Sequence, residues 1–372
     1  MKIKLLLFQF LTLLLLILAT LLVLRFSKNI FINTNRSQTQ LSQFNTSNTI
    51  KLIKSGTISQ LFRTYYYWIF ENTKYPCGKE GNHQFVIFQK DSSNDKRNLL
   101  VRYVGGFAGF FYPDSTSKLT YFPDSSFENL LRADTYTGSI SVRGLDRLIV
   151  DTKGWRIMSP SYCSHDLYLG KGQYNQTDGF ARWGYNAVED AINFTQVKFS
   201  TNRIIMYGTS AGSSGAFYHG INRKNVAGIV MDSFVVDLES LIKACEEGIQ
   251  PYNPKWSCTC NNQICVRVLG ERVGFTKNDQ PYFKINNKEV NVPLFVIFDK
   301  NDYLYNGHVN IEFSNTVQAI HTYNPGGKSV VQEVCVNDPK RSDQTCNMHS
   351  PTLENNQAAR EVYKWILSLE RN

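Results

Sequence analysis

The segment 203–222 reads RIIMYGTSAGSSGAFYHGIN. It begins with an apolar, β-rich run (203–208) and ends in a run of helical character (213–222). Between them, Gly208-Thr-Ser210-Ala-Gly212 forms a G-x-S-x-G motif. In this context the motif predicts a sharp strand-to-helix turn that holds the serine in a strained backbone conformation. Small residues two positions before and after it let neighbouring backbone approach closely. We therefore predict that Ser210 is a nucleophile.

Similar apolar runs and helical patterns alternate along the rest of the chain. Such alternation predicts an α/β fold with a mostly parallel sheet covered by helices, of the α/β-hydrolase type. The cysteine-rich stretch from about 250 to 290 has no clear period, and we expect an insertion or lid there. The predicted strands are 85–89, 99–106, 203–208, 226–233 and 292–298, with loop and strand over 147–163. The predicted helices are 184–194, 213–222, 237–249 and 355–370.

The N-terminal region differs from the rest of the chain. Residues Leu5–Leu24 form an apolar run of about 20 residues, which is long enough to span a bilayer core. We predict a signal anchor over 1–25, with a cleaved signal peptide as the alternative. Residues 26–60 are rich in Asn, Thr, Ser and Gln and are predicted as a polar linker. The catalytic domain is predicted over 61–372.

The net charge of +9 is concentrated at the N-terminus. Residues 1–60 hold 7 of the 40 basic residues and none of the 31 acidic residues. The remainder has 33 basic and 31 acidic residues, a net charge of +2. A nearly neutral body gives no reason to expect a nucleic-acid partner.

Cysteines and glycosylation sequons suggest the secretory pathway. An even number of cysteines behind a secretory segment predicts disulfides. The C-x-C-x4-C stretch at 258–265 lacks the usual pairs of a zinc site, so disulfides are also favoured there. The eight cysteines are Cys77, Cys163, Cys245, Cys258, Cys260, Cys265, Cys335 and Cys346. The four sequons begin at Asn35, Asn45, Asn175 and Asn193.

A serine nucleophile needs a base and an orienting carboxylate, in the chain order Ser, acid, His for this fold. His349 lies in a loop directly before the last predicted helix and is the favoured base, with His321 as the alternative. For the acid, the pattern favours Asp302 and leaves Asp299 and Asp232 as alternatives.

An acyl-transfer site also needs N–H donors for the oxyanion. One is predicted at Ala211, the residue after the nucleophile. The others are predicted at Gly106 and Phe107, in the glycine-rich stretch RYVGGFAGFF (102–111).

Several ordered motifs resemble the pectin acetylesterase and Notum carboxylesterase family over roughly residues 60–372. They are GTSAGSSG (208–215), YCSHDLYLG (162–170), VMDSFVVD (230–237), VPLFVIFDKND (292–302) and CNMH (346–349). The resemblance places the family's catalytic acid on Asp302 and its histidine on His349. The loop Gly105-Gly106-Phe107 departs from the family's Gly-Gly-Trp, and the cysteine that closely follows it in the family is absent.

We therefore expect a serine carboxylic ester hydrolase of the secretory pathway, either membrane-anchored or secreted. Its predicted substrate is an acylated glycan or a lipidated protein, as the resemblance implies. No cofactor and no metal are required, and a monomer is expected. The alternatives are a non-catalytic glycan- or protein-binding module on a hydrolase fold, and a secreted acyltransferase or peptidase with the same triad.

Overall fold

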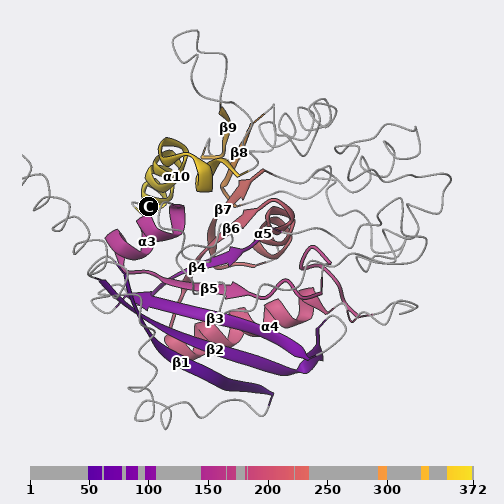
Figure 1. Ribbon diagram of the computed structural model, residues 1–372. Coiled ribbons are helices and arrows are strands. Elements are labelled where there is room, and N and C mark those ends of the chain that lie inside the picture. Colours follow the sequence, from indigo (N-terminus) through magenta and orange to yellow (C-terminus); the bar gives the residue numbers. More distant parts are fainter. Residues whose placement is uncertain are drawn as a thin grey trace, which may run out of the picture.

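The computed structural model describes 161 residues, all of which lie between residues 49 and 370 (Figure 1). Nine strands form one sheet within the described part of the chain. They are β1 (Ile50–Gln60), β2 (Arg63–Pro76), β3 (Asn82–Lys90), β4 (Asn98–Tyr103), β5 (Arg156–Pro160), β6 (Arg203–Thr209), β7 (Val226–Asp232), β8 (Leu294–Asp299) and β9 (Val330–Val334). The described residues are 49–60, 63–77, 81–90, 97–105, 144–164, 166–172, 181, 183–221, 223–233, 292–299, 328–334 and 350–370.

The sheet has an antiparallel edge and a parallel remainder. Its order is β1-β2-β3-β5-β4-β6-β7-β8-β9. Strands β1, β2, β3 and β5 pair antiparallel in turn, whereas β4 runs parallel to both β5 and β6. The remaining pairs, from β6 to β9, are also parallel. A mixed α/β fold with a mostly parallel sheet is therefore confirmed.

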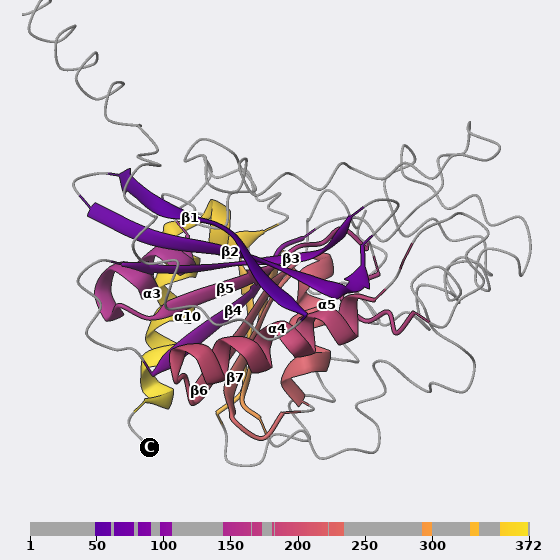
Figure 2. The same cartoon turned by 90° about the horizontal axis from the view of Figure 1, so that it is seen from below.

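Helices cover both faces of the sheet, as the second view shows (Figure 2). On one face, α3 (Leu145–Lys153) and α10 (Asn356–Leu369) pack against one hydrophobic cluster. On the other, α4 (Gly184–Phe199) and α5 (Ala211–Ile221) pack against a second. Successive residues of β4 alternate between the clusters, with Leu100 in the first and Val101 in the second. Both sheet faces are thus buried, as expected for parallel strands.

The antiparallel edge begins earlier than the sequence indicates. Strand β1 lies inside the range predicted as a linker and pairs with β2 from Ile50 to Gln60. Ile50 is buried in the core, whereas Lys51 is exposed. A Cβ at Gly56 would lie 2.7 Å from the Tyr67 hydroxyl, so a larger residue there would displace that side chain. Within the described part of the chain, the sheet therefore begins at Ile50, inside the range predicted as a linker.

Helix α3 is a second difference, since we predicted only loop and strand over 147–163. Its buried residues Leu145 and Ile149 recur at helical spacing. The helix ends at Gly154, which has a φ of 66° and donates its N–H to the Val150 carbonyl at 3.0 Å. This left-handed glycine cap is a common helix stop. The predicted strand follows as β5.

Three predicted segments lie outside the described residues: the N-terminal anchor (1–25), the helix over 237–249 and the cysteine-rich insertion near 250–290. Among the helices in the described part, none is both long and apolar enough to cross a membrane.

Candidate active site

Ser210 lies between a strand and a helix. Strand β6 ends at Thr209, and α5 begins at Ala211. Ser210 has a φ of 53°, a left-handed conformation that costs a non-glycine residue about 1–2 kcal/mol. Its backbone N–H donates to the Asp232 carbonyl of β7 at 2.8 Å. The residue is half-buried, whereas both its neighbours are buried. The predicted strand-to-helix turn is therefore confirmed, and it leaves Ser210 accessible at the carboxyl end of β6.

The two glycines of the motif are required by close backbone contacts. A Cβ on Gly208 would lie 2.1 Å from the Gly212 carbonyl oxygen, and a Cβ on Gly212 would lie 2.3 Å from the Tyr103 carbonyl oxygen. Real Cβ atoms do not approach backbone this closely. Any side chain at either position would therefore force the turn apart, which explains the spacing of G-x-S-x-G around Ser210.

Ser210 also lies where the strand connections change faces. The next described helix after β4 is α3, on one face of the sheet, whereas the helix after the neighbouring strand β6 is α5, on the other face. Ligands of open α/β sheets bind at the carboxyl ends of strands at such switch points. Gly105 follows β4 there, and a Cβ on it would lie 2.9 Å from Ser210 Cβ and 3.6 Å from Oγ. The loop predicted to supply oxyanion donors thus starts against the nucleophile.

The predicted site residues fall into two groups. Ser210 and Ala211 are described, and Ala211 is the first residue of α5. An N–H in the first turn of a helix has no partner within that helix, which suits an oxyanion donor. Gly106, Phe107, Asp302 and His349 lie outside the described residues, as does the alternative base His321. Their roles stay predictions.

Asp232, one of the alternative acids, ends β7 beside the Ser210 turn. It is in register with Thr209 of β6. One carboxylate oxygen, Oδ2, accepts from the Thr352 N–H at 3.0 Å and also from the Thr352 hydroxyl. Thr352 belongs to α9 (Pro351–Glu354), which begins two residues after His349. The carboxylate thus holds the start of α9. Asp299, the other alternative, is buried at the end of β8.

A buried polar cluster lies behind this turn on the α3 side of the sheet. The Tyr207 and Thr352 hydroxyl oxygens are 2.6 Å apart. Arg102 of β4 lies near the Tyr207 ring and forms a 2.9 Å ion pair with Asp146. Burial, together with Asp146 and Asp232, raises the pKa of Tyr207 well above 10. Tyr207 therefore stays neutral and can act as a hydrogen-bond donor.

Ser213 and its neighbour Ser214 lie within the first two turns of α5. The Ser213 hydroxyl contacts the carbonyl oxygens of Gly208 at 2.9 Å and Asp232 at 2.8 Å. It therefore bridges the strand before the turn and the neighbouring strand. Local sequence patterns do not predict the contact with Asp232, because it joins residues 19 positions apart.

The loop after β5 contacts the other side of the site. Asp166 accepts from the Ser164 hydroxyl and from the N–H groups of Tyr168 and Gly184. Tyr168, at a φ of 63°, donates its hydroxyl to the Val104 carbonyl at 3.2 Å. Because Val104 directly precedes Gly105, this loop supports the segment that contacts Ser210.

His219 on α5 has a structural role. It is fully buried, and Nδ1 lies 2.6 Å from Glu189 Oε1. Nε2 lies 2.9 Å from the Tyr168 carbonyl oxygen. Both ring nitrogens therefore have protein partners, in agreement with the choice of a base elsewhere in the chain.

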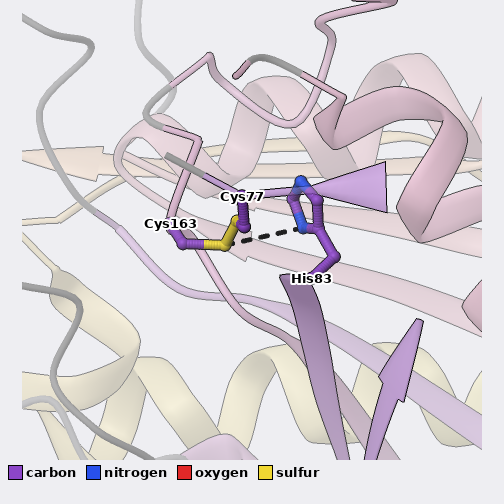
Figure 3. Close-up of side chains that lie close together, drawn as sticks. All are labelled: Cys77, His83 and Cys163. Carbon is purple, nitrogen blue, oxygen red and sulfur yellow. Dashed lines mark hydrogen bonds between the residues drawn. A yellow bond between two sulfur atoms is a disulfide. The ribbon is translucent and has the colours of Figure 1, made fainter. Parts of the chain in front are cut away.

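A second group of reactive side chains lies at the end of β2. Cys77 and Cys163 form a disulfide, and His83 Nδ1 lies 3.6 Å from Cys163 Sγ (Figure 3). Burial lowers the pKa of His83 to about 3, so its imidazole is neutral. These three side chains are close enough for a metal site, but sulfurs bonded to each other offer no thiolate. The predicted use of cysteines in disulfides is confirmed for this pair, and the other six cysteines lie outside the described residues.

Comparison with models of known protein families finds no match, and comparison with curated proteins finds none. The resemblance to the pectin acetylesterase and Notum family therefore rests on the sequence motifs and stays a prediction.

Proposed function

We propose that this protein is a serine carboxylic ester hydrolase of the α/β-hydrolase type. One observation carries the proposal. Ser210 lies in a left-handed strand-to-helix turn at the switch point of a mostly parallel sheet, against Gly105. This is the geometry in which hydrolases of this fold present a nucleophile. A serine in an ordinary glycine-rich loop needs neither the strained φ nor the close backbone packing at Gly208 and Gly212.

In the proposed reaction, Ser210 Oγ attacks the ester carbonyl carbon while His349 accepts the hydroxyl proton. Asp302 orients His349 and stabilises its charged form. The N–H groups of Gly106, Phe107 and Ala211 hold the developing oxyanion. When the carbon–oxygen bond breaks, His349 gives its proton to the leaving alcohol, and the acyl group remains on Ser210. Water, deprotonated by His349, then releases the carboxylic acid and restores Ser210.

The substrate class follows from the motif resemblance and from charge. The resemblance suggests O-acetyl groups on a glycan or a longer acyl group on a protein. The body beyond residue 60 has a net charge of only +2, so electrostatics gives an acidic polymer no particular support. The Cys77–Cys163 disulfide supports the proposed secretory location, because disulfides persist in oxidising compartments.

The test is ester hydrolysis by the full chain in detergent micelles. We expect turnover of 4-nitrophenyl acetate, octanoate or palmitate, and Ser210→Ala should lower it by up to about 10⁶-fold. Ser214→Ala is the matched control, because Ser214 is buried in the same helix and its hydroxyl has no partner among the described residues. It should hydrolyse like wild type.

The same assay separates the alternatives. Equal hydrolysis by wild type and Ser210→Ala would contradict the proposal. Absence of turnover on all three esters would favour the binding module. Acyl transfer to an added alcohol in preference to water would favour an acyltransferase, and cleavage of a peptide amide would favour a peptidase.

A further inference from the structure

We infer that Asp232 and Thr352 are positioning residues that join the Ser210 turn to the segment carrying His349. The inference rests on the proposed function, in which Asp302 is the triad acid and Asp232 is left to position the reacting groups. It is carried by four hydrogen bonds that converge on this one residue.

The main chain of Asp232 holds the nucleophile turn. Its carbonyl oxygen accepts from the Ser210 N–H and from the Ser213 hydroxyl, each at 2.8 Å. The first bond fixes the strained residue, and the second fixes the first turn of α5 that follows it. Ser210 directly follows Thr209, which is in register with Asp232 in the β6–β7 pairing, so a shift of Asp232 would move Ser210 with it.

The side chain of Asp232 binds α9, the short helix that follows the predicted base in the sequence. Oδ2 accepts both the N–H and the hydroxyl of Thr352. Asp232 and Thr352 are fully buried. The Thr352 hydroxyl also contacts Tyr207, the residue three positions before Ser210. Thr352 therefore has contacts to β6 and to β7, on either side of the nucleophile turn.

The chain between Thr352 and the predicted base is short, so anchoring Thr352 also restricts the base. His349 is bonded to Ser350, and three residues of chain span at most about 10–11 Å. Anchoring Thr352 thus limits where His349 can lie relative to Ser210. A misplacement of about 1 Å between reacting groups can cost on the order of 10²-fold in rate, so the anchor should affect turnover more than binding.

The size of the effect on turnover separates this role from that of a triad acid. Removing a triad acid, which accepts from the histidine ring, costs on the order of 10⁴-fold in turnover. Oδ2 of Asp232 accepts two donors from Thr352. Asp232→Asn keeps one acceptor oxygen for Thr352, so we expect it to lower kcat by about 10–10²-fold rather than 10⁴-fold.

The closing experiment compares Thr352→Val with Thr352→Ser in the full chain. Valine removes the hydroxyl at similar volume, whereas serine retains it. Active Ser210 is first titrated with a fluorophosphonate, so that misfolded protein does not lower the apparent rate. Per titrated site, we expect Thr352→Val to lower kcat about 10–10²-fold with KM within about threefold, and Thr352→Ser to restore most of it. Hydrogen exchange in peptides covering 350–354 should be faster in Thr352→Val than in Thr352→Ser.

The outcomes distinguish failure of the positioning role from failure of the proposed function. If Ser210→Ala is inactive but Thr352→Val has the wild-type kcat per site, the inference is wrong and the proposed function stands. A loss that serine does not repair, or that appears only in KM, also overturns the inference. If Ser210→Ala hydrolyses esters like wild type, the proposed function fails, and the positioning role fails with it.

Discussion

The antiparallel edge and the parallel half of the sheet are both built from paired strands, but only the parallel half forms the candidate active site. In the edge, β1, β2 and β3 are consecutive in sequence and pair with each other. In the parallel half, β4, β6 and β7 come from distant segments, yet their carboxyl ends meet at Gly105, Ser210 and Asp232. Parallel strands thus bring reactive groups together at the carboxyl ends of the strands. We expect substitutions there to change activity first and substitutions at the antiparallel edge to change stability first.

Apart from loss of Ser210 itself, the largest expected effect is at Gly105. A Cβ there would lie 2.9 Å from Ser210 Cβ, so Gly105→Val should displace the nucleophile or the loop. We expect kcat/KM to fall on the order of 10³-fold, as for loss of an oxyanion donor, with Gly105→Ala between valine and wild type. The melting temperature should change by only a few degrees. Wild-type kcat/KM in Gly105→Val would contradict the site geometry.

The next largest effect is expected at the antiparallel edge. Cys77 and Cys163 are separated by 86 residues, and replacing both with alanine should cost about 2–4 kcal/mol in the free energy of unfolding. The measurement is urea unfolding, with kcat/KM determined on the folded protein. We expect kcat/KM to stay within about threefold of wild type. A large loss of kcat/KM without loss of stability would reverse the contrast between the two regions.

A smaller effect is expected from the pH response of the same edge. The His83 pKa is about 3 in the folded protein and about 6.5 in the unfolded chain. Between these values the unfolded state binds a proton that the folded state does not. Stability should therefore fall as the pH drops through this window, by about 1.4 kcal/mol per unit.

His83→Gln cannot take up that proton. We expect its free energy of unfolding to fall between pH 7 and pH 5 by about 2 kcal/mol less than that of wild type. Urea unfolding at the two pH values tests this. Equal losses in the two proteins would mean that His83 is not held neutral by burial.

The parallel half could be predicted well because burial on both faces leaves a strong pattern. The apolar runs 203–208, 226–233 and 292–298 match β6, β7 and β8, and the G-x-S-x-G turn follows from local backbone constraints. Strand β1 escaped prediction because its sequence, IKLIKSGTISQ, mixes polar and apolar residues as an edge strand does. Helix α3 escaped because its nine residues run almost directly into β5.

The contacts that complete the site could not be predicted from the sequence. Thr352 and Asp232 are 120 residues apart, and neither belongs to a recognisable motif with the other. The same holds for Tyr168 and Val104, which are 64 residues apart. Such pairs form only when the fold brings the strand ends together, so local periodicity carries no trace of them.

The central claim is that Ser210 is an activated nucleophile. A fluorophosphonate reacts with such a serine by forming a phosphorus–oxygen bond and releasing fluoride, so the adduct can be located by mass spectrometry. We predict a single adduct on the peptide containing Ser210, lost in Ser210→Ala and retained in the control Ser214→Ala, with ester hydrolysis falling in step with labelling. An adduct on a different serine, with unchanged hydrolysis in Ser210→Ala, would contradict the account.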